Sequence, residues 1–178
     1  AEKGMLAVGC ALLAIMLYIW FRFEWQFSIA AILALSHDVI STIGLFSLTS
    51  FEFNLATVAA ILTIAGYSIN DTVVVFDRVR ENLRRYKSYE QRDILNKSLN
   101  ETLSRTVMTS VTTLLALLAI VIFGGAVLRD FALAMMWGVI IGTYSSVFVA
   151  VGMLAKFDLK RTEEDEEDGA AGDQGSTS

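Results

Sequence analysis

The sequence of 178 residues has no proline and only one cysteine, Cys10. A single cysteine cannot form a disulfide framework, and it gives no pattern of metal ligands. The sequence also shows no phosphate-binding loop, no nucleophile paired with a base and no metal-ligand spacing. We therefore expect no enzyme activity, no cofactor and no metal ion. Nothing in the sequence explains the lack of proline, which is comparatively frequent in transmembrane helices.

The main feature of the sequence is its long uncharged stretches. Hydrophobic residues make up 54% of the chain, and its mean hydropathy is +0.55. Several stretches approach the ~20 apolar residues that a helix needs to cross a bilayer. The net charge of −5 arises entirely from Lys156 onward, where three bases face eight acids. These features predict an integral membrane protein with an acidic, disordered cytoplasmic tail over residues 156–178.

Five apolar stretches predict an all-α transmembrane domain over residues 1–155. We expect the spans at about residues 5–23, 27–50, 55–76, 102–123 and 130–154. Asn54 is a candidate N-cap for the third span. The bases are distributed very unequally between the two sides of the bilayer: with residues 78–101 in the cytoplasm, all lysines and arginines except Lys3 and Arg129 are cytoplasmic. Under the positive-inside rule, the N-terminus is then periplasmic and the C-terminus cytoplasmic.

The basic segment 78–101 between the third and fourth spans has apolar residues at helical spacing. This pattern predicts two amphipathic helices lying at the membrane surface. Ser88 followed by Gln91 has the spacing of a capping box that starts the second helix. The segment has no aromatic platform or groove-reading motif, so we expect membrane lipid and not nucleic acid as its partner.

A carboxylate inside the third span is the first candidate functional group. Asp71 follows Asn70 and lies about two helical turns before Arg78. An ionisable group within a membrane span is costly and often functional. Arg105, at a similar depth in the next span, is a candidate cationic partner because guanidinium suits contact with a carboxylate. Two alternatives stay open: Asp71 in a purely structural pair, and an Arg105 that snorkels to the headgroups.

Two other polar features mark the predicted spans. His37 and Asp38 lie near the middle of the second span and form a possible intramembrane pair, whose alternative role is to specify packing. In the fourth span, Arg105 shares a face with threonines and alanines, and we expect this face to line the interior as a seam made of Thr109, Thr112, Ala116 and Ala119.

The fifth span carries small residues at a four-residue period, which predicts a close helix-packing face. Its members are Ala134, Gly138, Gly142, Ser146 and Ala150. Before this span, Gly124 and Gly125 predict a tight turn.

Four segments of the sequence resemble the SecF subunit of the bacterial Sec protein translocase, of the SecDF family and the resistance-nodulation-division superfamily. The similarity covers about residues 5–155, and its densest parts are Ala34–Ile40, Ala65–Asn82, Asn100–Thr106 and Phe123–Gly125. The sister subunit SecD typically carries Asp-Ala-Asn where this sequence has Asn70, Asp71 and Thr72, which favours SecF.

The resemblance implies a six-helix membrane module that pairs with SecD, with SecYEG and YajC nearby, in the bacterial inner membrane. Family members use proton-motive force in late steps of preprotein translocation. By motif match, Asp71 is the proton-carrying carboxylate and Arg105 its cationic partner, next to Asn70, while His37 and Asp38 match a further family motif. The family also has one more span and a periplasmic domain before the position of Met5, through which the preprotein would mainly be contacted.

Three functions therefore compete. The first is a proton-coupled protein-export subunit. The second is a structural membrane scaffold whose buried charges only specify helix packing with a partner. The third is a small-molecule exporter of the same superfamily, which would need a substrate pocket in an exported domain.

Overall fold

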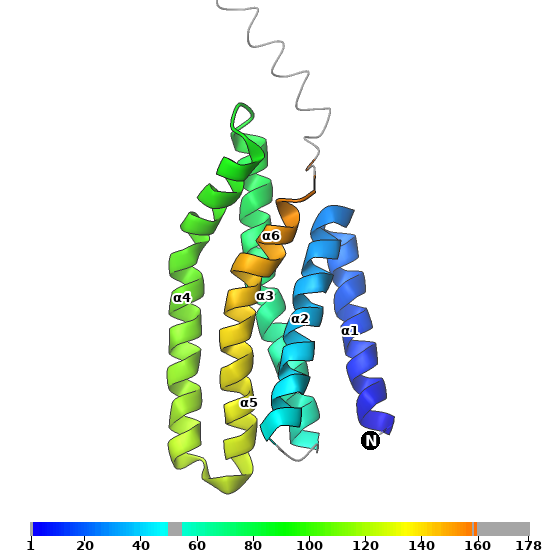
Figure 1. The fold of residues 1–178 in the computed structure, drawn as a ribbon, viewed down its shortest axis with the longest axis vertical. Coiled ribbons are helices and arrows are strands. Elements are labelled where there is room, and N and C mark those ends of the chain that lie inside the picture. Colours follow the sequence, from blue (N-terminus) through cyan, green and yellow to red (C-terminus); the bar gives the residue numbers. More distant parts are fainter. Residues whose placement is uncertain (1, 50–54, 158, 160–178) are drawn as a thin grey trace, which may run out of the picture.

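The computed structural model describes residues 2–49, 55–157 and 159, and this part of the chain is all-helical, as predicted. Figure 1 shows its elements side by side, with the long helices packed along their length. They are α1 (Glu2–Arg22), α2 (Trp25–Thr49), α3 (Leu55–Arg85), α4 (Gln91–Phe123), α5 (Gly125–Tyr144), the π-helix η1 (Ser145–Ala150) and α6 (Val151–Leu154).

Four helices are long and apolar enough to cross a membrane: Trp25–Thr49, Ala56–Arg85, Gln91–Phe123 and Leu128–Leu154. The last of these combines α5, η1 and α6, which follow one another without a break and are called the last helix below. The expected span at residues 5–23 corresponds to α1, whose apolar part in the described residues is the shorter stretch Gly9–Arg22. A fifth crossing therefore stays a prediction.

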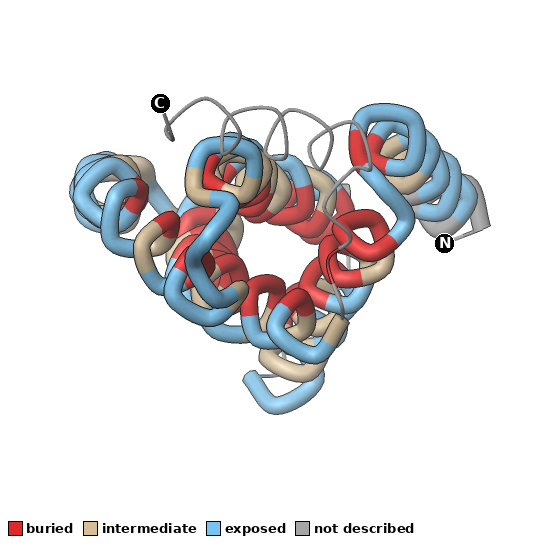
Figure 2. The backbone as a smooth tube through the Cα atoms, turned by 90° about the horizontal axis from the view of Figure 1, so that it is seen from above, coloured by how far each residue is buried: buried red, intermediate tan, exposed pale blue. Residues whose placement is uncertain are grey.

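Helix α3 lies at the centre of the packing and contacts α1, α2, α4 and α5. Seen from above, the buried residues gather on the sides of the helices that face one another, and the outer sides are exposed (Figure 2). One end of the core holds three aromatic rings, Phe23, Phe27 and Phe76, with centroids 5.3–6.2 Å apart. Many large apolar side chains are exposed on these outer sides, as expected of helices that face lipid or a partner.

The prediction of separate surface helices over residues 78–101 is wrong. Helix α3 continues without a break to Arg85, and α4 starts at Gln91 and runs straight into the fourth apolar stretch. The reason lies in the apolar stripe of this segment: Val79, Leu95 and Ile94 are 0–3% exposed, and the first two belong to the main core cluster. The stripe therefore packs against other helices, and α3 and α4 together form a helical hairpin over this segment.

The expected capping box at the start of α4 is absent. The N-cap residue is Glu90, and its side chain makes no capping hydrogen bond. Gln91 instead fastens α4 to the end of the last helix. Its Nε2 donates to the carbonyl oxygens of Leu154 (3.1 Å) and Phe157 (2.8 Å), and the backbone N–H of Leu159 donates to its Oε1 (3.2 Å). The predicted N-cap Asn54 and the tail beyond Leu159 lie outside the described residues.

The small residues of the last helix allow a very close approach to α3. All five, Ala134, Gly138, Gly142, Ser146 and Ala150, are buried. A Cβ atom on Gly138 would lie 2.2 Å from Cγ1 of Ile64, and one on Gly142 would lie 3.1 Å from Cβ of Ser68. Glycine at position 138 therefore leaves room for the side chain of Ile64, and a methyl group at position 142 would be a tight contact with Ser68.

The predicted turn at Gly124 and Gly125 is confirmed. The backbone N–H of Gly124 donates to the carbonyl oxygen of Ile120 at 2.7 Å and closes α4. Gly125 then adopts a φ of +74°, which only glycine takes readily, and α5 starts. The chain thus reverses direction within two residues.

Candidate intramembrane site

Asp71 is a buried carboxylate on the central helix α3. It is 3% exposed, and its Oδ2 atom is buried without a hydrogen-bond partner among the described residues. Burying an ionised carboxylate without full hydrogen bonding is costly, more so within a membrane. The position therefore favours a group whose charge can be neutralised or compensated.

Arg105 lies on α4 and is the cation whose charge acts on Asp71. The two side chains do not touch, since no nitrogen of Arg105 comes within the 4.0 Å of a direct ion pair with Asp71. Arg105 is exposed on the outside of α4, and Asn70 is exposed on the outside of α3. The structure therefore combines a buried acid with two polar groups on the outer surface.

The predicted interior seam on α4 is wrong. Arg105, Thr112, Ala116 and Ala119 are exposed, and Thr109 is only partly buried. The buried face is shifted by one residue from the predicted seam. It carries hydroxyl groups, again at a four-residue period, from Ser98, Thr102, Thr106 and Ser110. Ser110 shares a 2.6 Å hydrogen bond with Thr143 of α5, which ties α4 to the last helix.

His37 and Asp38 on α2 contact each other and also reach α3. Asp38 is fully buried, and its Oδ1 lies 3.0 Å from Nδ1 of His37. Its Oδ2 accepts a short hydrogen bond from the hydroxyl of Ser68, one helical turn before Asp71. Ser145, the first residue of η1, donates to the carbonyl oxygen of Ala34 at 3.2 Å. This polar cluster joins α2, α3 and the π-helix.

Sequence reasoning did not single out Ser68 as a partner of Asp38. The spacing did indicate that Ser68 is buried, since it lies three residues before Asp71 and thus on the same side of the helix. The π-helix had no signal that we recognised, because its segment reads as an ordinary apolar helix.

A network of charged and polar side chains joins α3 to α4 on the hairpin side of Asp71. The Arg78 guanidinium donates to Glu101 of α4 and to Glu81 of its own helix, both at 2.6 Å. Asn82 donates to the same Glu101 oxygen at 2.8 Å and to the hydroxyl of Ser98 at 3.0 Å. These bonds join α3 to α4 about two turns beyond Asp71. Within the described residues, no three His, Cys, Asp or Glu side chains come together as they would around a metal ion.

Comparison with known proteins identifies similar chains. The family described as "Protein export membrane protein SecD/SecF, C-terminal" matches residues 1–160. The Protein translocase subunit SecF of Rhodobacter capsulatus is 60% identical over 154 residues, which cover 86% of this chain and 46% of that protein. The SecF subunit of Cereibacter sphaeroides is 54% identical and covers 90% of this chain and 49% of that protein. The chain thus spans about half the length of these curated relatives.

Two solved structures have the same arrangement of helices. The crystal structure of SecDF, a translocon-associated membrane protein from Thermus thermophilus, matches with a TM-score of 0.82 at 51% identity, over 85% of this chain and 21% of that one. A second SecDF crystal structure, in a super-membrane-facing form, matches with a TM-score of 0.77 at 46% identity, over 92% and 21%.

Proposed function

Because the chain belongs to the SecD/SecF C-terminal family of protein-export membrane proteins, we propose that it couples proton-motive force to late steps of preprotein translocation. The family consists of transport proteins and not of enzymes, so the chemistry to explain is the movement of a proton and of helices. One observation carries the proposal: Asp71 is 3% exposed, one of its carboxylate oxygens has no hydrogen-bond partner among the described residues, and it lies in the field of Arg105 without touching it.

In this mechanism Asp71 alternates between a protonated and an ionised form. Two unit charges ~4 Å apart attract by about 4 kcal/mol at an effective dielectric constant of 20, and at ~8 Å by about 2 kcal/mol. Asp71 and Arg105 are more than 4.0 Å apart, so their attraction is weaker than the first of these values. A change of this size is enough to shift the balance between two conformations that differ by a few kcal/mol.

The contacts of α3 support transmission of such a shift. The helix that carries Asp71 is bonded to α2 through Asp38 and Ser68, and to α4 through Arg78 and Glu101. It also packs closely on the last helix at Gly138. In our proposal His37 and Asp38 hold α2 against α3, so that a movement of α3 displaces its neighbours together.

The surroundings of the site indicate where partners would bind. Arg105 and Asn70 are exposed on helices apolar enough to lie in a membrane, where an uncompensated cation is costly. We propose that a SecD subunit covers this surface and completes the site, and that the pair works beside SecYEG and YajC. The chain would cross the bacterial inner membrane five times, α1 included, with the α3–α4 hairpin in the cytoplasm.

The experiment that tests the proposal measures preprotein export in cells that carry the full-length protein with Asp71→Asn. Asparagine keeps the size and hydrogen bonding of aspartate but cannot carry a proton. We expect assembly with the partner to persist and export to fall to the level of a deletion strain. Asp130→Asn is the matched control, since it removes an exposed carboxylate near the start of the last helix, and it should leave export unchanged. Normal export with Asp71→Asn would refute proton coupling through this residue.

The second candidate function is a structural scaffold, and two observations favour it. Asp38 is already satisfied by His37 and Ser68, and Asp71 makes no direct ion pair with Arg105 in the described chain. In a scaffold the charges only select the correct packing with a partner. The same experiment separates the two functions, because a scaffold tolerates Asp71→Asn.

A further inference from the structure

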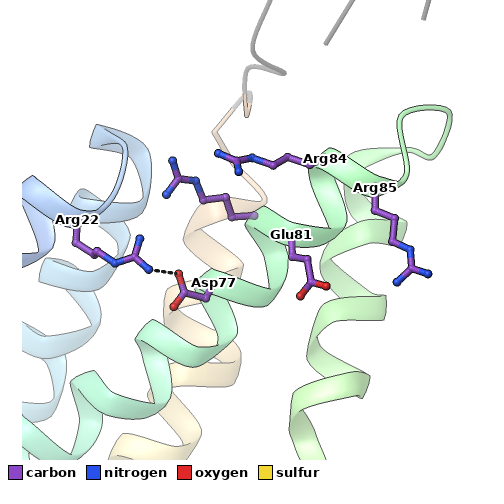
Figure 3. A pocket seen from close by; sticks show the side chains of 6 residues that line it. Arg22, Asp77, Glu81, Arg84 and Arg85 are labelled. Atoms are coloured by element: carbon purple, nitrogen blue, oxygen red, sulfur yellow. Dashed lines mark hydrogen bonds and ion pairs between the residues drawn. The ribbon is translucent and has the colours of Figure 1, made fainter. Parts of the chain in front are cut away.

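A basic pocket lies where α1 ends against the hairpin part of α3. Its volume is about 480 Å³, and its lining combines four arginines with two acids: Arg22, Arg80, Arg84, Arg85, Asp77 and Glu81. In Figure 3, Arg22 extends from the end of α1, and the other labelled side chains extend from α3.

The two acids of the pocket are already paired. Asp77 lies 3.3 Å from the Arg22 guanidinium, and Glu81 lies 2.6 Å from Arg78, which is outside the pocket. Arg80 and Arg84 have no acidic partner in the part of the chain that the structure describes. In Figure 3 the guanidinium of Arg84 extends toward the side of Arg22, whereas that of Arg85 points away from it. The pocket therefore has an excess of positive charge.

Arg80 adds a second, independent observation. Its Nε atom is buried and has no hydrogen-bond acceptor among the described residues. A buried donor without an acceptor costs about 1–3 kcal/mol, and more when the group is charged. An anion with several acceptor oxygens in the pocket would remove this cost.

The length of α3 and the exposed tryptophans support a position of the pocket at the depth of lipid headgroups. From Leu55 to Asp77 the helix α3 rises ~33 Å at ~1.5 Å per residue, slightly more than the ~30 Å of a hydrocarbon core. Trp20 and Trp25, which are 64% and 55% exposed, lie near the same end of the bundle, as tryptophans at a membrane interface do. Just inside this level, Leu17 and Phe21 of α1 are 70% and 97% exposed and offer an apolar surface for acyl chains.

We propose that this pocket binds the phosphate group of an anionic phospholipid. The planar fork of an arginine guanidinium matches the oxygens of a phosphate, so Arg80 and Arg84 would hold the headgroup between α1 and α3. The exposed apolar face of α1 favours a lipid over free phosphate as the source of the group. Basic pockets between membrane helices on the cytoplasmic side are known to take such headgroups.

The test measures how much phosphatidylglycerol stays bound to the full-length protein, purified with its partner subunit in detergent, by native mass spectrometry. Arg84→Gln is the main variant, because Arg84 is exposed and its loss should not affect folding. We expect about fivefold weaker retention, from about 1 kcal/mol per basic residue near an anionic lipid. Arg80→Gln should weaken it by at least as much, and Arg84→Lys by less.

Arg92→Gln is the matched control, since Arg92 is an exposed arginine of the same hairpin outside this pocket. Retention should be unchanged in this variant, and phosphatidylcholine should be retained equally by all variants. Equal losses in Arg84→Gln and Arg92→Gln would mean non-specific attraction and would overturn the proposal.

Two further arms distinguish other anions. Displacement of the lipid by millimolar inorganic phosphate would assign the pocket to free phosphate and not to a lipid. A fivefold rise in lipid retention after deletion of residues 163–178 would assign it to the carboxylates of the acidic tail. Either result would refute the lipid assignment. The absence of an effect in both measurements would support it.

Discussion

Gly138→Ala should destabilise the bundle through a single steric contact. The new methyl group would lie 2.2, 2.5 and 2.7 Å from Cγ1, Cδ1 and Cγ2 of Ile64, whereas carbon atoms in contact prefer about 3.5–4.0 Å. Overpacking of this kind costs about 1–3 kcal/mol. At about 2 kcal/mol, the ratio of folded to unfolded protein would fall roughly 30-fold.

The assay is the free energy of unfolding in mixed micelles of mild detergent and dodecyl sulfate, followed by circular dichroism. Alanine also favours helices over glycine by about 1 kcal/mol, so the effect must be compared with a glycine that has free space. Gly66→Ala on α3 is that control, because no atom would lie within 4 Å of its new Cβ. We expect Gly138→Ala to be less stable than Gly66→Ala by about 1–3 kcal/mol.

A double variant isolates the contact. Ile64→Ala removes all three atoms that the new methyl group would meet, at its own cost of about 2–5 kcal/mol. In that background Gly138→Ala should have the same effect as Gly66→Ala, which gives a coupling energy of at least ~1 kcal/mol between the two sites. Additive effects would refute the close approach of the last helix to α3 at Gly138.

Three further predictions concern single side chains. Arg105→Lys should keep most export activity and Arg105→Gln should lose it, because Arg105 acts on Asp71 by charge and not by a bidentate contact; equal loss in both variants, measured by export in cells, would indicate a direct contact. Ser68→Ala should lower the free energy of unfolding by about 1–3 kcal/mol, because it removes a hydrogen bond to the fully buried Asp38; an unchanged value would contradict this bond. Gln91→Ala should increase hydrogen exchange at the end of the last helix, which it holds by three hydrogen bonds; unaltered exchange there would show that the helix end needs no such support.

The all-helical class and the location of Asp71 inside an apolar helix could be predicted from the sequence, because both depend on the length and polarity of the apolar stretches. The face of α4 could not. Lipid and protein interior are both apolar, so the seam of Arg105 and Thr112 and the buried stripe of Ser98 and Thr106 look alike in the sequence. Only the packing against α3 and α5 decides between them.

The hairpin and the π-helix show a second limit of the sequence. The apolar stripe of residues 78–101 fits a membrane surface and a helix–helix contact equally well, and the burial of Val79 and Ile94 decides for the second. In the last helix, hydrogen bonding changes from the α to the π pattern at Ser145 without glycine or proline to mark it. At this point Ser145 bonds to Ala34 of α2, which lies 111 positions away, so the local sequence does not contain the contact made there.

The fastening by Gln91 makes α4 and the last helix a closed frame. At one end the two helices are joined covalently through Gly124 and Gly125, and at the other they are joined by the Gln91 side chain. Two rods that are connected at both ends cannot slide past each other, although they can twist or tilt together. A displacement of α4 that begins at Arg105 would therefore carry the last helix with it.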